Sequence, residues 1–241
     1  VYLAGILEQQ LGAVTAWVSV MFTIGAVMIL MAFYHVRMLP KGGSVEKEVK
    51  TLNEGFSKLW DVLKTFFQKK HIYWYIAFII LYRFAEGFAV KIVPLFFKAE
   101  VSEGGLGLTT AQIGLIIGTL GTVAFVLGSL LGGYFIAKRG LKKVLIFLVA
   151  CFNIPFAAYA FLAVTQTDSL FLIGGAVVLE YFGYGFGFVG LMLFMMQQVA
   201  PGKYKMAHYA FATGIMNLGF MLPSMISGYF SDLLGYKIFF F

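Results

Sequence analysis

The sequence predicts an all-α membrane protein, and three observations support this prediction. First, 61% of the 241 residues are hydrophobic and only 12% are charged, whereas about a quarter of the residues in an ordinary soluble domain are charged. Second, several apolar stretches are long enough to cross a bilayer as helices. Third, none of these stretches alternates polar and apolar residues, as the strands of a membrane barrel do. Helices also satisfy the backbone hydrogen bonds that lipid cannot.

Apolar segments of membrane length recur along the whole chain. They are residues 13–34, 72–97, 112–136, 141–164, 170–197 and 207–230, and a seventh begins near Tyr236. The chain opens at Val1 without a starting Met and stops at Phe241 inside an apolar run, so we expect it to be part of a longer polypeptide. Its single cysteine, Cys151, excludes a disulfide within the chain.

The basic residues predict the orientation of these segments. Of the 18 basic residues, eight lie between the first and second segments, four between the third and fourth, and two after the fifth. Connections rich in Lys and Arg stay on the cytoplasmic side. We therefore expect these three connections to face the cytoplasm, and we interpret the net charge of +7 as a topology signal rather than as a nucleic-acid site.

The long basic connection contains one amphipathic pattern. Its apolar residues are spaced alternately four and three apart, which places them on one stripe of a helix: Val45, Val49, Leu52, Phe56, Leu59, Leu63 and Phe66, with Trp60 and Phe67 beside them. Ser44 is a suitable N-cap. We expect a helix on the membrane surface that joins two halves of a larger protein. A short coiled coil is the alternative.

Three charged residues interrupt segment 72–97. They are Arg83, Glu86 and Lys91. Even low estimates put the cost of an ionised side chain at the bilayer centre at roughly 2.5–3.5 kcal/mol, so such a residue faces a partner or a polar cavity. Arg83 and Glu86 are three apart and share a helix face, where they can pair, whereas Lys91 lies further outward and can reach the interface. Glu180 has a comparable depth in the fifth segment.

These residues define candidate roles. A carboxylate removed from water can bind and release a proton near neutral pH, so Glu86 and Glu180 are candidates for proton coupling. Arg83 is a candidate to bind an anionic solute through its planar fork, and a purely structural ion pair with Glu86 is the alternative. Three tyrosines are candidates to line a sugar or aromatic site, with core packing as the alternative: Tyr82, Tyr181 and Tyr184.

Glycines and internal matches predict how the segments are arranged. In the third segment glycines fall on one narrow helix face, where close packing is expected: Gly114, Gly118, Gly121, Gly128 and Gly132. Residues 133–135 match 228–230 at an offset of 95, and residues 84–89 match 182–187 at an offset of 98. Together these matches indicate a three-helix repeat. An odd number of spans per repeat makes the second copy inverted.

The loop after the third segment carries a recognisable motif. Residues 132–143 read Gly-Gly-Tyr-Phe-Ile-Ala-Lys-Arg-Gly-Leu-Lys-Lys. This run resembles the loop signature of the major facilitator superfamily. The matching positions are Gly133, Lys138, Arg139, Gly140, Lys142 and Lys143. Ala137 stands where the family usually has Asp, so the gating role given to that Asp does not carry over.

Further motifs resemble one group within that superfamily. They include Leu81-Tyr82-Arg83-Phe84-Ala85-Glu86-Gly87, Pro94-Leu95-Phe96-Phe97-Lys98, Asn153-Ile154-Pro155 and Ser227-Gly228-Tyr229-Phe230-Ser231-Asp232. They look like the peptide–acetyl-CoA–drug transporter group, which includes AmpG-like muropeptide permeases and acetyl-CoA transporters. The resemblance implies the C-terminal half of a major facilitator fold with inverted three-helix repeats. The last N-terminal-half helix with its outer loop would be 1–36, the cytoplasmic linker 37–71 and the C-terminal bundle 72–241.

The resemblance also implies a function. We expect a proton-coupled secondary transporter that moves a small polar or anionic solute, such as a muropeptide or amino-sugar conjugate, by alternating access across the bacterial cytoplasmic (inner) membrane. Its partners would be the solute, the proton, the bilayer and the N-terminal half. No cofactor or metal is expected, and no catalytic set is visible. The alternatives are an acetyl-CoA, other anion or drug carrier, and a non-transporting membrane sensor or scaffold.

Overall fold

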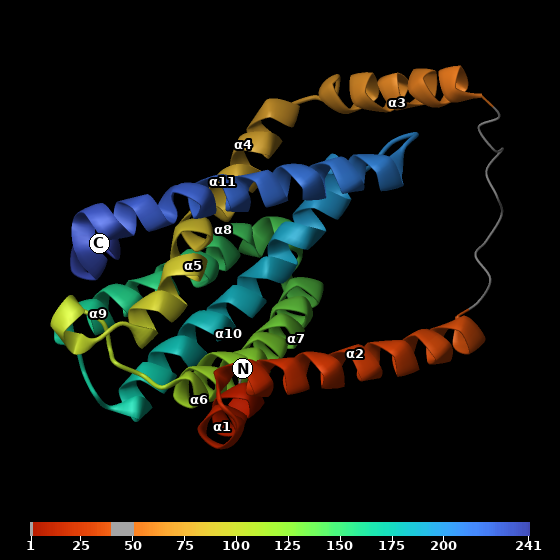
Figure 1. Ribbon diagram of the computed structural model, residues 1–241. Coiled ribbons are helices and arrows are strands. Elements are labelled where there is room, and N and C mark those ends of the chain that lie inside the picture. Colours follow the sequence, from red (N-terminus) through yellow and green to blue (C-terminus); the bar gives the residue numbers. More distant parts are fainter. Residues whose placement is uncertain (1, 40–50) are drawn as a thin grey trace.

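A computed structural model describes residues 2–39 and 51–241. Within these ranges every regular element is a helix (Figure 1). The α-helices are α1 (Tyr2–Leu11), α2 (Ala13–Met38), α3 (Leu52–Phe67), α4 (Ile72–Tyr82), α5 (Phe84–Lys98), α6 (Thr110–Ile113), α7 (Thr122–Arg139), α8 (Leu141–Asn153), α9 (Ala157–Thr165), α10 (Leu170–Phe194) and α11 (Lys205–Phe239). Irregular helical turns link some of them: 3₁₀ turns at Val101–Glu103 and Ile154–Phe156, and π-helical segments at Gly114–Gly121 and Met195–Val199.

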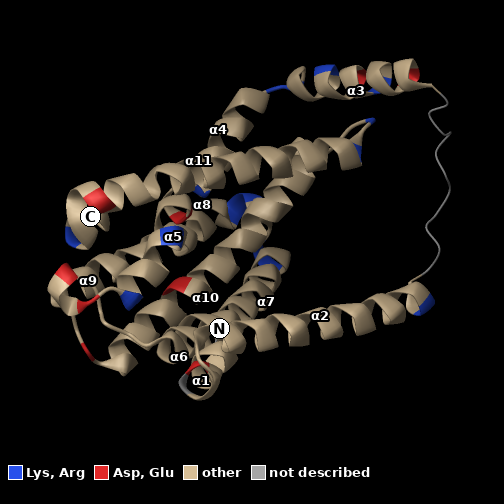
Figure 2. Ribbon diagram, in the orientation of Figure 1, with Lys and Arg blue, Asp and Glu red and all other residues tan. Residues whose placement is uncertain are grey.

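Five helical stretches among the described residues are long and apolar enough to span a membrane. They are Ala13–Met38, Thr110–Arg139, Leu141–Thr165, Leu170–Val199 and Lys205–Phe239. Charged residues gather mainly at the ends of these helices, and long stretches between them carry no charge (Figure 2). The stretches coincide with five of the six predicted segments, which confirms the prediction of an all-α integral membrane protein.

The predicted single helix over residues 72–97 is wrong in one respect. The structure divides it into α4 and α5 at Arg83, whose φ of −105° and ψ of 5° are not helical. Neither piece alone reaches the roughly 20 residues that a spanning helix needs. The interruption falls at the residue whose long side chain turns back to pair with Glu86 in the first turn of α5. Arg83, one of the three charged residues noted in this segment, is therefore also the residue at which the helix breaks.

Three other boundaries differ from or refine the expectations. Where the sequence indicated an outer loop ahead of the first span, the structure has helix α1. The linker helix α3 begins at Leu52, and the expected cap Ser44 lies outside the described residues. Within α11, Gly235 has φ 71° and ψ 158°. This non-helical residue separates the last long span from a short helical piece that starts at Tyr236, as predicted.

Helix α10 lies at the centre of the bundle and packs against α7 (Figure 1). Glycines make this close approach possible. A Cβ at Gly128 would lie 2.2 Å from the carbonyl oxygen of Phe182, and one at Gly132 would lie 2.5 Å from that of Phe186. The predicted tight contact is therefore confirmed for this part of the glycine face. Gly118, by contrast, has open space where its side chain would be.

The other face of α10 packs on α8 in the same way. A Cβ at Gly183 would lie 2.3 Å from the carbonyl oxygen of Cys151, and one at Gly187 would lie 2.6 Å from that of Leu148. Backbone thus meets backbone on both sides of α10, an arrangement typical of helices packed in membranes. As a result α10 is packed closely between α7 and α8.

Two separate apolar clusters form the core. One contains Ile79, Tyr82 and Leu191, and the other contains Ala89 and Val177, with their neighbours. Along α4 and α5 the border between the clusters falls between residues 82 and 89, and along α10 it falls between residues 177 and 191. A polar site placed at this border has apolar packing both above and below it.

Candidate functional site

Arg83 and Glu86 form a buried, bidentate ion pair at the break between α4 and α5. The Nε and Nη2 atoms of Arg83 each donate to a carboxylate oxygen of Glu86 at 2.6 Å. The two residues are 7% and 4% exposed. Fork-to-fork pairing of this kind is the strongest geometry available to an arginine and a carboxylate. The pairing predicted from their spacing is what the structure contains.

Two aromatic rings enclose the guanidinium. The Cζ atom of Arg83 lies 4.7 Å from the centre of the Phe220 ring on α11 and 5.4 Å from that of Phe188 on α10. Ring faces attract cations, and more strongly when water is excluded. Arg83 is therefore held by one carboxylate and two rings that come from different helices.

Glu180 lies on α10 at the other side of the same region. It is 4% exposed, and its Oε2 atom accepts a hydrogen bond of 2.9 Å from the hydroxyl of Tyr159 on α9. Tyr159 is itself only 2% exposed. No cation contacts Glu180 in the hydrogen bonds and ion pairs described for this structure, so its partner is a neutral phenol rather than a charge.

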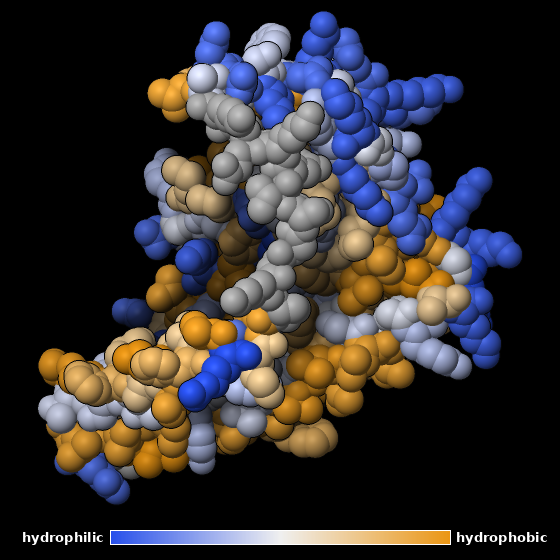
Figure 3. All heavy atoms as spheres, turned by 90° about the vertical axis from the view of Figure 1, so that its right-hand side faces the viewer, coloured by the Kyte–Doolittle hydropathy of each residue, from blue (hydrophilic) through white to orange (hydrophobic). Residues whose placement is uncertain are grey.

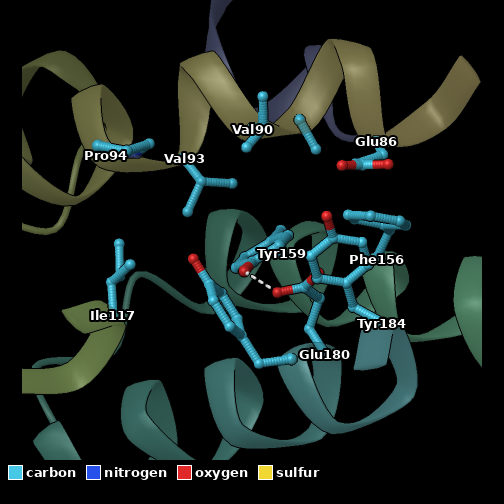
Figure 4. Close-up of a pocket in the computed structure, with 11 residues that line it drawn as sticks. Glu86, Val90, Val93, Pro94, Ile117, Phe156, Tyr159, Glu180 and Tyr184 are labelled. Carbon is cyan, nitrogen blue, oxygen red and sulfur yellow. Dashed lines mark hydrogen bonds between the residues drawn. The ribbon is translucent and has the colours of Figure 1, made fainter. Parts of the chain in front are cut away.

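The carboxyl groups of Glu86 and Glu180 line one small cavity (Figure 4). Its volume is about 70 Å³, which is room for a few water molecules. Figure 4 shows Glu86 reaching in from α5 and Glu180 from α10, with the Tyr184 ring rising from α10 so that its hydroxyl points toward Glu86. The remaining lining is mostly apolar: Ala89, Val90, Val93, Pro94, Ile117, Phe156, Tyr159 and Tyr181.

The backbone around this cavity is irregular on three sides. Besides the break at Arg83, Ile117 belongs to the π-helical segment and Phe156 to the 3₁₀ turn that contains Pro155. Within a membrane, irregular backbone is tolerated where it is buried in protein or lines a cavity. Single π-turns also occur often at functional sites. The convergence of these irregularities marks the cavity as the candidate site.

The candidate tyrosines do not all meet there. Tyr181 and Tyr184 line the cavity, and their rings are 6.4 Å apart in an edge-to-face arrangement. Tyr82 instead lies in the packed core, where its hydroxyl donates to the carbonyl of Gly187 at 2.7 Å. Lys91 is exposed, in keeping with its predicted separation from the ion pair.

The loop motif lies at the end of the bundle rather than at the cavity. Lys138 and Arg139 occupy the last turn of α7, and Lys142 and Lys143 the first turn of α8. Gly140 joins the two helices with φ 81°, a value that favours glycine. Gly133 has no atom within 4 Å of the place where a Cβ would lie.

Arg139 also lies over the Phe135 ring, with its Cζ atom 4.8 Å from the ring centre. Its guanidinium is thereby held against its own helix at the end of α7. This geometry fits the anchoring role expected for the basic residues of the loop.

Tyr159 is the site residue that sequence reasoning missed. It follows the Asn153-Ile154-Pro155 motif by four residues, and the 3₁₀ turn at Ile154–Phe156 sets the direction in which α9 leaves. A tyrosine in an apolar segment resembles ordinary core packing. The only sequence signal was its closeness to the proline that breaks the helix.

Most of this chain matches a known family of proteins. A family model described as the Major Facilitator Superfamily matches residues 1–228. The chain belongs to the major facilitator superfamily. The resemblance read from the loop motif is thereby confirmed, and the helical architecture is the fold of that family.

Curated relatives within the superfamily are similar over much of this chain. The anhydromuropeptide permease of Escherichia coli (strain K12) is 23% identical over 181 residues, which cover 74% of this chain and 35% of the permease. The putative transporter AmpG 2 of Rickettsia prowazekii is 24% identical over 238 residues, which cover 95% of this chain and 53% of that protein. The chain thus spans between a third and about half of the length of these relatives.

Proposed function

We propose that this chain forms the C-terminal half of a secondary active transporter, with residues 1–36 at the end of the N-terminal half. The transporter would carry a small polar or anionic solute by alternating access and draw on a proton gradient. The observation that carries the proposal is the buried cavity where Glu86 and Glu180 face each other beside Arg83. An enzyme is disfavoured because the family consists of membrane carriers.

The geometry supports a simple form of proton coupling. With Glu86 ionised, the guanidinium of Arg83 is fully engaged by its carboxylate. A proton that reaches Glu86 removes the negative charge of that partner, so the guanidinium loses the Coulombic attraction of the ion pair and both contacts weaken. Arg83 would then be available to a carboxylate or phosphate of the solute. Release of the proton restores the ion pair and displaces the solute.

Glu180 offers a second proton site in the same cavity. Its hydrogen bond from Tyr159 holds the carboxyl group toward the space that Glu86 also lines. Because like charges in a low dielectric repel strongly, the two carboxylates disfavour simultaneous ionisation. A proton that moves between them through the few waters the cavity can hold would pass from α5 to α10.

The cavity is too small for a solute in this conformation. Binding sites for small molecules measure roughly 300–1,000 Å³, against about 70 Å³ here. Solute entry would therefore require α5 and α10 to separate or the N-terminal half to contribute the opposite wall. The break at Arg83 gives α5 a joint about which it can move relative to α4.

The relatives favour one class of solute. The E. coli relative is an anhydromuropeptide permease by name, and a solute of that class presents carboxylates and sugar rings. Arg83 suits the former, and Tyr181 and Tyr184 suit the latter. The same relative supports the bacterial cytoplasmic membrane as the proposed location. An acetyl-CoA, other anion or drug carrier is the second candidate, because Arg83 would equally bind a phosphate.

Uptake by proteoliposomes tests the transport proposal. The full-length protein, reconstituted with an imposed proton gradient, is expected to accumulate a labelled anhydromuropeptide and to lose accumulation when a protonophore collapses the gradient. Labelled acetyl-CoA and a free amino sugar serve as competing solutes. Absence of uptake for all of them would favour a sensor or scaffold instead.

Charge-removing substitutions test the coupling separately. Glu86→Gln and Glu180→Gln are expected to abolish accumulation while exchange of solute down its own gradient persists. Glu103→Gln, in the exposed turn between α5 and α6, removes a carboxylate that does not line the cavity and serves as the matched control. If both cavity variants accumulate solute like the control, neither carboxylate couples the proton.

A further inference from the structure

Helix α3 exposes one continuous apolar face to its surroundings. Leu52 is 85% exposed, Phe56 70% and Trp60 69%. Together with Leu59 and Phe67, which are also exposed, these residues form what we call the α3 apolar face. Exposed apolar side chains on this scale mark a surface that binds a partner or a membrane.

A different face of α3 is packed on the bundle. Val62 and Phe66 are buried, and the Phe66 ring lies 5.7 Å from both His208 and Phe211 of α11. The hydroxyl of Thr65 is 3.2 Å from the Nε2 atom of His208. These contacts occupy the side of α3 that runs next to the apolar face.

Polar contacts fix the rotation of α3 about its axis. Asp61 accepts a hydrogen bond of 2.6 Å from the hydroxyl of Tyr204 and pairs with Lys203 at 3.3 Å. The hydrogen bond from Tyr204 and the contact with Lys203 hold the pKa of Asp61 below its ordinary value, so it is ionised at neutral pH. At the end of α3, Lys69 donates to the carbonyls of Val199 and Pro201. The α3 apolar face therefore cannot turn toward the bundle unless these polar contacts of Asp61 and Lys69 break.

The α3 apolar face continues onto the first turn of α4. The rings of Phe67 and Tyr73 lie 6.5 Å apart, and Tyr73 and Trp74 are 71% and 76% exposed. Tyr and Trp are enriched where helices leave the hydrocarbon and enter the headgroup region. The surface thus connects α3 to the part of α4 that enters the apolar bundle.

Two exposed lysines flank this surface. Lys64 and Lys70 are exposed on α3 and just after it. Viewed from the right-hand side of Figure 1, hydrophilic residues gather over the upper part of the molecule, where α3 lies, and hydrophobic ones over the lower part, where α2 lies (Figure 3). A helix with an apolar face and flanking lysines is complementary to a bilayer surface that carries anionic headgroups.

We propose that α3 binds the anionic phospholipid surface of the cytoplasmic leaflet, with its apolar face inserted among the headgroups and Lys64 and Lys70 paired with phosphates. The polar contacts of Asp61 and Lys69 with residues 199–204 hold the helix in the rotation that this requires. This inference goes beyond the transport proposal, and it stands whether or not the protein carries a solute.

Tryptophan quenching in nanodiscs tests the insertion. The native tryptophans of the full-length protein are replaced by Phe, and a single reporter is introduced as Phe56→Trp on the apolar face or as Ser57→Trp, about 100° round the helix. With brominated acyl chains, the reporter at 56 is expected to lose emission and the reporter at 57 to keep it. Equal quenching at both positions, or quenching at neither, would overturn the proposal.

The lipid charge is tested in the same system. Quenching at position 56 is expected to rise as phosphatidylglycerol replaces phosphatidylcholine, and the double variant Lys64→Gln/Lys70→Gln is expected to lose this rise. Quenching at position 56 that does not change with lipid charge would contradict the proposal that the bound lipid is anionic. Crosslinking of a Phe56→Cys variant to another part of the protein would show that protein, rather than lipid, covers this face.

Discussion

Tyr159 donates a hydrogen bond to Glu180 and is itself surrounded by aromatic side chains. Its own ring lies 6.1 Å from that of Phe97 and 5.9 Å from that of Phe240. These contacts fix the ring, so the hydroxyl can point at little else than the carboxyl group of Glu180. A hydrogen bond donated to a carboxylate stabilises its ionised form.

The substitution Tyr159→Phe tests this role. It keeps the ring and removes only the hydroxyl, and a hydrogen bond to a charged group contributes about 1.5–3 kcal/mol. Without it the ionised form of Glu180 is less favourable, so the proton is released at higher pH. If Glu180 couples the proton, we expect the pH of half-maximal uptake to rise by about one unit or more. The measurement is the pH profile of solute accumulation in proteoliposomes.

Tyr209→Phe provides the control for that experiment. Tyr209 lies on α11, and its hydroxyl contacts the sulfur of Met192 away from the cavity. Loss of this hydroxyl is expected to leave the pH profile in place. A profile that moves equally in both variants would assign the effect to general destabilisation rather than to Glu180.

Much of the candidate site could be predicted at the level of single residues. Charges within apolar segments are rare, so Arg83, Glu86 and Glu180 stood out without a structure. Tyr159 could not be found this way, because a tyrosine in an apolar run looks the same whether it packs or donates. Tyr82 shows the reverse case, since its position beside Arg83 suggested the cavity while its side chain points into the core.

At the scale of elements, the approach of α7 to α10 depends on individual glycines. A Cβ at Gly128 would meet backbone atoms of α10, which cannot move aside as a flexible side chain could. Gly133 lies on the same helix, one and a half turns further on, with open space around it. The two positions offer a matched pair on one element.

Gly128→Ala is expected to destabilise the protein, whereas Gly133→Ala is not. Overpacking typically costs about 1–3 kcal/mol, while alanine in open space gains up to about 1 kcal/mol of helix propensity over glycine. Thermal unfolding of the two purified variants, followed by size-exclusion fluorescence, measures the difference. Equal melting temperatures would show that α7 and α10 do not meet as closely as described.

Helix positions were predictable from the sequence, but their interruptions were not. Hydropathy averages over a window and therefore reports where a segment is apolar, not where its backbone departs from α-helical geometry. The break at Arg83 falls within a run that hydropathy indicates as one apolar segment. The π-helical segment Gly114–Gly121 lies in a run rich in glycine, and such a run fits a regular helix equally well.

At the scale of the whole molecule, the distribution of charge defines two ends. The polar contacts of Asp61 and Lys69 with residues 199–204, and the loop between α7 and α8, lie in the connections that carry most of the basic residues. The turn between α5 and α6 carries acidic residues instead, among them Glu100 and Glu103. The positive-inside rule assigns the basic end to the cytoplasm.

Cysteine labelling tests this orientation. In a background with Cys151→Ala, a cysteine at exposed Ser102 is expected to react with a membrane-impermeant maleimide in intact cells, and a cysteine at exposed Lys142 is expected to react only in inverted vesicles. The opposite pattern would reverse the topology. Labelling of both sites in intact cells would show that the cells leak or that the protein inserts in two orientations.

The divided helix α4–α5 has a consequence for how the protein enters the membrane. Its two pieces contain 11 and 15 residues, or about 16 and 22 Å at 1.5 Å per residue, against a hydrocarbon core of about 30 Å. They must therefore be inserted together, with Arg83 and Glu86 already neutralising each other. A single substitution such as Glu86→Leu, which unlike Glu86→Gln leaves no side-chain acceptor, removes the partner of the guanidinium within the bilayer, where the loss of a buried partner costs about 3–5 kcal/mol. We therefore expect loss of either member of the pair to lower the yield of protein in the membrane. Replacement of both Arg83 and Glu86 by apolar residues is expected to restore that yield, even where transport is lost.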